Sequence, residues 1–92
     1  NFDIRDFTVI VSGGTRGIGK AVTELFLREK CRVIALYSSN DVAAEELSNQ
    51  WTDYPLKTVK IDVADYDAVE QFYRDFDATH ATLDVLVNCA GI

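Results

Sequence analysis

The stretch that decides the fold reads Ser12-Gly13-Gly14-Thr15-Arg16-Gly17-Ile18-Gly19. It follows an apolar run over residues 7–11, and a helical pattern begins within it at Ile18. A strand, a glycine-rich turn and a helix start in this order form an anion site, because the first N–H groups of a helix lack partners and the helix dipole is positive there. Glycine also lets a phosphate approach the backbone closely. The stretch therefore predicts a phosphate-binding turn, since a plain connection needs only one or two glycines.

Two phosphate-binding motifs overlap in this turn. From Gly14 the chain spells Gly-Thr-Arg-Gly-Ile-Gly-Lys-Ala, which is a nucleotide-triphosphate P-loop except at its last position. Ala21 has no hydroxyl to hold Mg²⁺, and Thr23 lies two residues too late on the helix to replace it. From Gly13 the pattern is G-x-x-x-G-x-G, which differs from the G-x-G-x-x-G of the common dinucleotide fingerprint. The missing hydroxyl makes an NTPase the less favoured interpretation.

The composition excludes several classes of protein. The 92 residues make one small domain or part of one, and the net charge of −6 argues against nucleic acid, which needs a basic face. The apolar runs are short, so we expect neither a signal peptide nor a membrane span. Cys31 and Cys89 are too few for a disulfide scaffold, and we expect two reduced thiols in a cytoplasmic protein. His80 has no second metal-ligand pattern nearby, so we predict no metal site.

Apolar patterning predicts strands and helices that alternate along the whole chain. Short apolar runs favour strands, and apolar residues spaced by three and four favour helices. The expected strands cover residues 7–11, 31–36, 56–61 and 83–87. The expected helices cover residues 17–29 and 41–51, followed by a third that Asp65 or Asp67 caps and that ends before residue 77. We therefore expect an α/β fold, a Rossmann-like doubly wound parallel sheet with strand order 3-2-1-4.

Helical periodicity also predicts which side chains are buried. The first helix carries one apolar stripe, which we expect to face the core and which consists of Ile18, Ala21, Val22, Leu25 and Phe26. Trp51 extends an apolar stripe on the second helix, so we expect it in the core rather than as a stacking platform. Asn40 or Asp41 is expected to cap that helix.

Four segments follow the predicted strands at their carboxyl ends: residues 13–19, 37–40, 62–63 and 88–91. In a doubly wound fold the ligand lies over these ends, where the strand order reverses. Together the four segments resemble the short-chain dehydrogenase/reductase family, whose glycine motif reads Thr-Gly-x-x-x-Gly-Ile-Gly. Ser12 stands here in place of the Thr and keeps its hydroxyl. The resemblance covers nearly all of the chain.

The resemblance implies a role for each segment. In the family an Asp-Val after the third strand contacts the adenine ring, and Asp62 and Val63 match it; the alternative is that Asp62 caps the turn into the third helix. An Asn-Asn-Ala-Gly after the fourth strand packs beside the cofactor ribose. It reads Asn-Cys-Ala-Gly here, so Cys89 departs from the pattern while a backbone contact would survive. The cofactor-binding candidates are Ser12, Gly13, Gly14, Thr15, Arg16, Gly17, Ile18, Gly19, Tyr37, Ser38, Ser39, Asp62, Val63, Asn88, Cys89, Ala90 and Gly91.

The charges around the expected ribose site favour one cofactor. An NAD enzyme places an acidic residue about 20 positions beyond the glycine motif, where it bonds the ribose 2′-OH. Tyr37, Ser38 and Ser39 occupy that place and include no carboxylate, while Arg16 in the turn can reach the same ribose. A cation and hydroxyls suit a 2′-phosphate, so we expect NADP(H) rather than NAD(H).

Within the family the chain most resembles bacterial 3-oxoacyl-[acyl-carrier-protein] reductases. The resemblance rests on Gly-Gly-Thr-Arg-Gly-Ile-Gly at residues 13–19, on the Tyr-Ser-Ser turn at residues 37–39 and on Leu-Val-Asn-Cys-Ala-Gly-Ile at residues 86–92. It implies a homotetramer that reduces an acyl-carrier-protein-bound or other small 3-oxoacyl substrate in fatty acid synthesis, with no nucleic acid or membrane as partner. The alternatives are a related enzyme for sugars, polyols or steroids, and a non-catalytic nucleotide-binding module.

The family's catalytic residues are a Ser and a Tyr-x-x-x-Lys downstream of the fourth strand. The residues four positions after Tyr37, Tyr54, Tyr66 and Tyr73 are never lysine, so this chain contains no such motif. We therefore expect residues 1–92 to be the N-terminal, cofactor-binding part of one Rossmann domain, and we assign them no catalytic residue.

Overall fold

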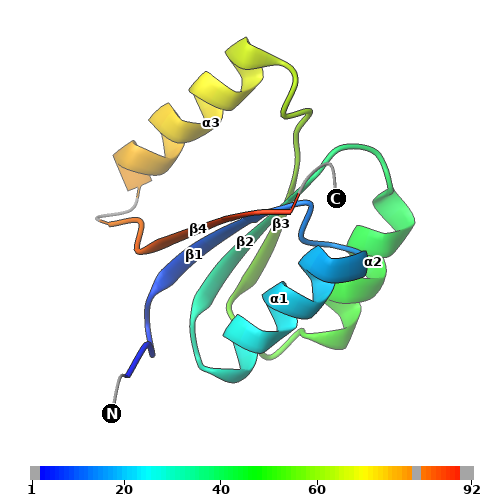
Figure 1. Cartoon of the computed structure of the whole chain (residues 1–92), viewed down its shortest axis with the longest axis vertical. Helices are drawn as coiled ribbons and strands as arrows, with labels where there is room; N and C mark the ends of the chain where they lie inside the picture. Colours follow the sequence, from blue (N-terminus) through cyan, green and yellow to red (C-terminus); the bar gives the residue numbers. More distant parts are fainter. Residues whose placement is uncertain (1–2, 80–81, 90–92) are drawn as a thin grey trace.

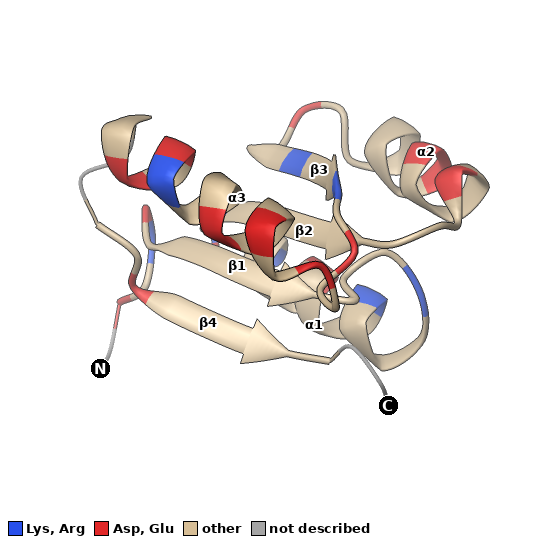
Figure 2. Ribbon diagram, turned by 90° about the horizontal axis from the view of Figure 1, so that it is seen from above, with Lys and Arg blue, Asp and Glu red and all other residues tan. Residues whose placement is uncertain are grey.

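The computed structural model describes residues 3–79 and 82–89 of the chain. Its elements follow one another as β1 (Thr8–Ser12), α1 (Gly17–Arg28), β2 (Arg32–Tyr37), α2 (Asp41–Gln50), β3 (Leu56–Lys60), α3 (Tyr66–Thr79) and β4 (Val85–Asn88). The strands pair in parallel in the order β3-β2-β1-β4 (Figure 1, Figure 2). The predicted α/β fold and the predicted strand order are both confirmed.

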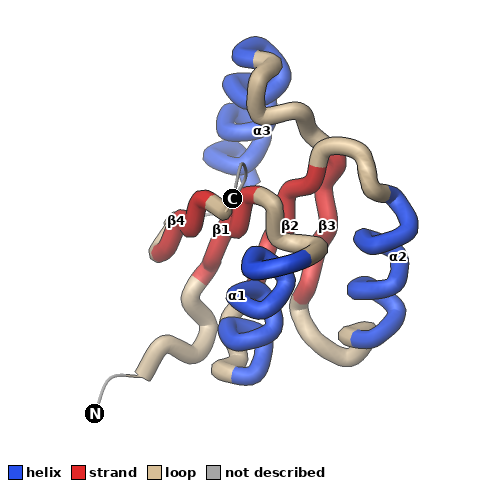
Figure 3. The backbone as a smooth tube through the Cα atoms, turned by 45° about the vertical axis from the view of Figure 1, so that its right-hand side comes forward, coloured by secondary structure: helices blue, strands red, loops and turns tan. Residues whose placement is uncertain are grey.

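The helices cover both faces of the sheet. α1 and α2 lie on one face, and α3 lies on the other (Figure 1, Figure 3). Successive side chains of a strand point to opposite faces, which explains how one strand serves both layers. Val9 and Val11 of β1 pack in a cluster with Leu27 of α1, whereas Ile10 packs in a cluster with Phe76 of α3. The burial of β1 on both faces, predicted from its apolar run, is confirmed.

α1 is rotated about its axis relative to the sequence-based expectation. Its innermost face is formed by Gly19, Thr23 and Leu27, which are buried. The predicted apolar stripe is wrong at Ile18 and Leu25, which are 60% and 54% exposed, and Ala21 is exposed as well. Two other members of that stripe are half-buried and pack against the core: Val22 and Phe26. The physical reason is that small side chains at positions 19 and 23 let the helix approach the glycine turn, and this close approach fixes its rotation.

The helix caps decide two alternatives that the sequence left open. Asn40 Oδ1 accepts from a backbone N–H three residues later at 3.0 Å, so Asn40 rather than Asp41 caps α2. Asp65 Oδ1 accepts from the equivalent N–H at 3.1 Å, so Asp65 rather than Asp67 caps α3. α3 then continues to Thr79, beyond the end predicted before residue 77.

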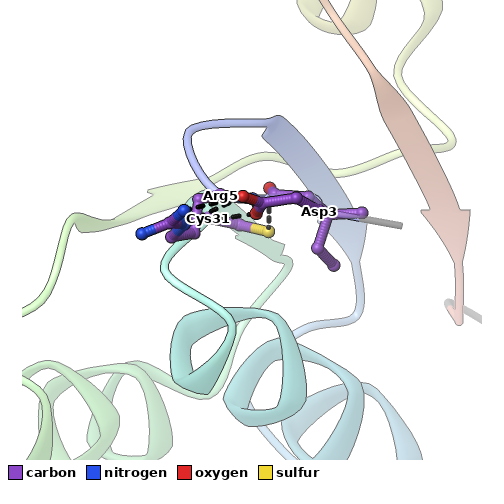
Figure 4. Close-up of polar contacts among 4 residues, drawn as sticks. Asp3, Arg5 and Cys31 are labelled. Carbon is purple, nitrogen blue, oxygen red and sulfur yellow. Dashed lines mark hydrogen bonds and ion pairs between the residues drawn. The ribbon is translucent and has the colours of Figure 1, made fainter. Parts of the chain in front are cut away.

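The segment before β1 is fastened beside Cys31 (Figure 4). The Cys31 thiol donates to the Ile4 carbonyl at 3.2 Å, and Arg5 pairs with Asp3 at 2.8 Å. Hydrogen bonds from Arg5 lower the pKa of Asp3 to about 2, and burial raises the pKa of the Cys31 thiol. Cys31 precedes β2 and Cys89 follows β4, so they lie at opposite ends of the parallel sheet, and both are free thiols as predicted.

Two kinds of feature are absent from the described residues. No helix among them has the length and apolar composition needed to cross a membrane. Nor do residues 3–79 and 82–89 contain a group of three or more His, Cys, Asp or Glu side chains that could hold a metal ion.

Candidate functional site

The glycine-rich turn joins β1 to α1 at the carboxyl end of the sheet (Figure 1). Gly13 has a φ of +68°, a left-handed conformation that glycine adopts without a side-chain clash. The N–H groups of Gly13 and Gly14 donate to the Leu36 carbonyl at 2.8 and 3.1 Å, which ties the turn to β2. A Cβ at Gly19 would overlap the Gly13 carbonyl oxygen. Gly19 is therefore needed for close contact within the turn rather than for packing the helix against a strand.

Gly14 is the glycine that packs α1 against the sheet. A Cβ at this position would lie 2.9 Å from the Ala35 Cβ of β2 and 2.8 Å from the Thr23 hydroxyl of α1. That hydroxyl is fully buried and donates to the Gly14 carbonyl at 2.9 Å. Thr23 is thus engaged in holding the turn to the helix, which argues further against a Mg²⁺-binding P-loop.

α1 begins without a protein side chain capping its N-terminus. Arg16 is the N-cap residue, with an extended backbone (φ −153°, ψ 164°) and no side-chain cap hydrogen bond within the described structure. The first turn of α1 also contains no acidic residue. The N–H groups of this turn are therefore left for a ligand, and the positive end of the helix dipole favours an anion.

A cavity of about 350 Å³ lies where the four predicted segments meet. It is lined by Gly13, Thr15, Arg16, Gly17, Ile18, Gly19, Leu36, Tyr37, Ser38, Ser39, Asn40, Ile61, Val63 and Cys89. Each of the four segments contributes at least one of these residues, so the structure brings them together as expected. Among the described residues that line it, Arg16 is the one with a formal charge.

Three lining residues were not named as candidates from the sequence. Leu36 and Ile61 look like ordinary core residues of apolar strands, and Asn40 looks like a helix cap, which it also is. Only their position in the chain could have identified Leu36 and Asn40 as lining residues, because they directly flank the candidates Tyr37, Ser38 and Ser39. The apolar side chains of Leu36 and Ile61 form a hydrophobic wall of the cavity, which suits a flat aromatic ring.

Ser12 and Asn88 meet at the carboxyl ends of β1 and β4. They are register partners, and the Ser12 hydroxyl donates to Asn88 Oδ1 at 2.7 Å. Both line a second cavity of about 310 Å³ on the α3 side of the sheet. The sequence showed that Ser12 has a hydroxyl where the family has that of a Thr, but it did not show the hydrogen-bond partner of this hydroxyl. The pairing of β1 with β4 brings that partner, Asn88, into place. The candidates Ala90 and Gly91 lie outside the described residues.

The Asp62 carboxylate has the turn-capping role that was the alternative to an adenine contact. Its Oδ1 accepts from the Ala64 N–H at 2.9 Å, and the Asp62 carbonyl accepts from the Asp65 N–H at 2.9 Å. Val63 is 49% exposed and lines both cavities. The predicted contact of Val63 with an adenine ring therefore has space, and the contact predicted for Asp62 stays a prediction.

The loop after β2 offers hydroxyl and amide groups to the cavity rather than charge. Ser38 and Ser39 are exposed there, and Tyr37 is half-buried. Partial burial is the largest cause that raises the pKa of the Tyr37 phenol, and the nearby Asp41 carboxylate raises it further. The Asp41 carboxylate itself lies 3.2 Å from Lys60 Nζ. This edge of the cavity can thus donate several hydrogen bonds to an oxygen-rich ligand.

Known proteins share this sequence pattern. The family model described as short chain dehydrogenase matches residues 7–92. The acetoacetyl-CoA reductase of Paracoccus denitrificans is 37% identical over 83 residues, which are 90% of this chain and 33% of that protein. The 3-oxoacyl-[acyl-carrier-protein] reductase of Chlamydia trachomatis is 37% identical over 89 residues, or 92% of this chain and 35% of that protein. The chain therefore spans about a third of the length of the curated relatives it matches.

Solved structures share the fold. A putative 3-oxoacyl-reductase from Bacillus thuringiensis has a TM-score of 0.86 and 27% identity, over 95% of this chain and 37% of that one. The 4-hydroxyisoleucine dehydrogenase complexed with NADH has a TM-score of 0.79 and 33% identity, over 95% of this chain and 35% of that one. The Pseudomonas aeruginosa RhlG/NADP complex, at 24% identity and a TM-score of 0.83 over 99% and 37% of the two chains, agrees in fold. The glycine turn, the cavity and these matches lead to one conclusion: the chain belongs to the short-chain dehydrogenase family, whose members are oxidoreductases that bind NAD(P).

Proposed function

We propose that this chain is the cofactor-binding part of an NADP-dependent reductase that acts on 3-oxoacyl thioesters. The observation that carries the cofactor choice is the charge pattern of the cavity. Arg16 is its one charged lining residue within the described ranges 3–79 and 82–89, and residues 37–40 carry hydroxyls and an amide but no carboxylate. A 2′-phosphate needs a cation and hydrogen-bond donors, whereas a free 2′-OH is bound by an acidic residue.

The residues present fit a dinucleotide phosphate. Nothing lies within 4 Å of the Cβ position of Gly17, so the start of α1 is open to a ligand, and the absence of a side chain at Gly19 keeps the turn closely packed. The uncapped N–H groups of α1 would hold the pyrophosphate, and Leu36, Ile61 and Val63 would contact the adenine ring. When bound, the cofactor supplies hydride chemistry; the residues of this chain bind and orient it.

Two relatives support the substrate class. Acetoacetyl-CoA reductase and 3-oxoacyl-[acyl-carrier-protein] reductase are both 37% identical to the chain, and both names describe a 3-oxoacyl thioester. Relatives with other substrates also match, among them an NAD-dependent glycerol dehydrogenase at 27% identity. A polyol-type enzyme is therefore the second candidate. We further propose, by family resemblance, a cytoplasmic homotetramer.

The cofactor proposal is tested by Arg16→Ala in the complete protein that contains this chain. Removing a charge-assisted contact with phosphate loses roughly 2 kcal/mol, so NADPH affinity should fall about thirtyfold while NADH affinity changes little. Isothermal titration calorimetry with both cofactors measures this directly. Arg32→Ala is the matched control, because Arg32 begins β2 at the opposite end of the sheet.

Equal affinity of the unaltered protein for NADPH and NADH would contradict the proposal, as would an unchanged preference in Arg16→Ala. The substrate class is tested separately, by following NADPH oxidation with a 3-oxoacyl thioester and with a polyol-derived ketone. Turnover of the ketone alone would favour the second candidate. The next hundred or so residues of the complete protein should contain the Tyr-x-x-x-Lys motif; its absence would favour a non-catalytic nucleotide-binding module.

A further inference from the structure

Three charged or phenolic side chains from three different elements lie beside the cavity, which Tyr37 itself lines and which Asp41 and Lys60 adjoin through their chain neighbours Asn40 and Ile61. Tyr37 ends β2, Asp41 begins α2, and Lys60 ends β3 as the register partner of Tyr37. Lys60 Nζ lies 3.2 Å from Asp41 Oδ2, and the two side chains are 55% and 62% exposed. Figure 2 shows the basic residues of β3 between the acidic residues of α2 and α3.

Asp41 is the first carboxylate that follows the loop at the ribose end. It lies 22 positions after Gly19 (41 − 19), which is two residues beyond Ser39 and the place where NAD-binding proteins carry the acidic residue for the ribose 2′-OH. The Asp41 N–H donates to the carbonyl of Ser39 at 3.0 Å, and Ser39 lines the cavity, so this hydrogen bond holds the Asp41 backbone next to the cavity lining. An unpaired carboxylate here would repel a 2′-phosphate held by the neighbouring cavity lining, because charges closer than the screening length of about 8 Å at physiological salt interact appreciably.

Exposed ion pairs between single side chains contribute little to folding stability. The Lys60–Asp41 pair is of this kind, so its removal should leave the fold intact. The Lys60–Asp41 pair has a larger effect on the net charge that a ligand encounters at the edge of the cavity than on folding stability. With Lys60 in place the pair is neutral, and the guanidinium of Arg16, which lines the cavity, leaves the site net positive.

We propose that Lys60 is a positioning residue for cofactor specificity, which neutralises and restrains the Asp41 carboxylate so that this edge of the cavity accepts a 2′-phosphate. This inference rests on the proposed NADP preference and extends it to a residue outside the four segments. Arg16 acts on the phosphate directly; Lys60 acts through Asp41. Without Lys60, Asp41 becomes available to repel NADP and to accept a hydrogen bond from the 2′-OH of NAD.

The test measures the ratio of NADPH to NADH dissociation constants by calorimetry in the complete protein. Lys60→Ala should shift this ratio toward NADH by about three- to tenfold, which corresponds to the roughly 1 kcal/mol of one charge interaction across a few ångströms of water. Lys57→Ala is the matched control, because it removes the same charge from an exposed position near the opposite end of β3. Lys60→Arg should keep the original ratio, and the double variant Lys60→Ala with Asp41→Asn should restore it.

The outcomes separate this inference from the proposed function. If the unaltered protein prefers NADPH and Arg16→Ala loses the preference while Lys60→Ala does not, the role of Lys60 is wrong and the proposed cofactor stands. If Asp41→Asn fails to restore the ratio in the Lys60→Ala background, Lys60 does not act through Asp41 and the inference is overturned. If the unaltered protein binds both cofactors equally, the proposed function falls and the inference falls with it.

Discussion

At the scale of single residues, Gly19 is the position where a side chain has no room. Its Cβ would overlap the Gly13 carbonyl, and that part of the turn is backbone that cannot rotate away. Thr15 is buried beneath the turn, and Gly13 needs its left-handed φ, so the loop cannot relax as a whole. The geometry of the anion site therefore depends on Gly19 more than on the charge of the neighbouring Lys20.

We expect Gly19→Val to lower cofactor affinity at least tenfold, because strain of a few kcal/mol must distort the turn. Lys20→Ala should change affinity less than threefold, since Lys20 does not line the cavity. Cofactor titration of both variants measures the difference, with circular dichroism to check folding and Gly19→Ala as a smaller perturbation. A larger loss in Lys20→Ala than in Gly19→Val would bring back the P-loop interpretation.

At the scale of elements, Trp51 fastens the end of α2 to α1. Its indole N–H donates to Glu24 Oε2 at 2.9 Å, its ring packs against the core cluster, and the Arg28 guanidinium lies 5.5 Å from the ring centroid. Tyr54 meets the same ring edge-on at 4.8 Å. The expectation that Trp51 belongs to the core is confirmed, although its indole also makes a polar contact that the helical pattern did not predict.

Trp51→Ala should destabilise the complete protein by about 2 kcal/mol, which is below the value for a fully buried aromatic residue because Trp51 is half-buried. Trp51→Phe keeps most of the packing and should lose about 1 kcal/mol with the hydrogen bond. Urea unfolding measures both, and combining Trp51→Phe with Glu24→Ala isolates the contact. A change below about 0.5 kcal/mol in Trp51→Ala would show that α1 and α2 do not depend on this contact.

At the scale of the whole molecule, the sheet has an open edge at β4. In the order β3-β2-β1-β4 this strand pairs only with β1 among the described elements, and Leu86 at its centre is 55% exposed. Asp84, which directly precedes β4, accepts a hydrogen bond from the Thr8 N–H at 2.8 Å, so its charge is held at the start of the strand. Exposed Ile18 and Leu25 on α1 add to the uncovered apolar surface. Unpaired edges and apolar patches of this kind recruit other chains.

We therefore predict that residues 1–92 alone do not persist as a soluble monomer that binds NADPH. The relatives are about three times longer than the matched region, and a small chain buries a smaller share of its surface. Sedimentation velocity, amide exchange and NADPH titration of the isolated chain test this. Leu86→Lys should reduce self-association by placing a charge on the edge. A well-protected monomer of residues 1–92 with micromolar affinity for NADPH would contradict the prediction.

The sequence by itself determined the order of elements, the strand order and the place of the site. The elements and the site follow from local patterns: the apolar run before Ser12, the glycines at 13 and 19 and the periodicity of the helices, each of which acts within a few residues of the chain. The strand order follows from the doubly wound fold that this alternation of strands and helices predicts. Because parallel strands end at the same edge, four local segments sufficed to locate the cavity.

Only the tertiary structure decided which partner each side chain takes. Periodicity gives a helix an apolar stripe, but the rotation of α1 was set by how closely Thr23 approaches Gly14, and so Leu25 stays exposed. The Ser12–Asn88 and Asp41–Lys60 contacts join residues 76 and 19 positions apart in the chain. Such pairs depend on strand register and side-chain reach after folding, and no local pattern in the sequence encodes that geometry.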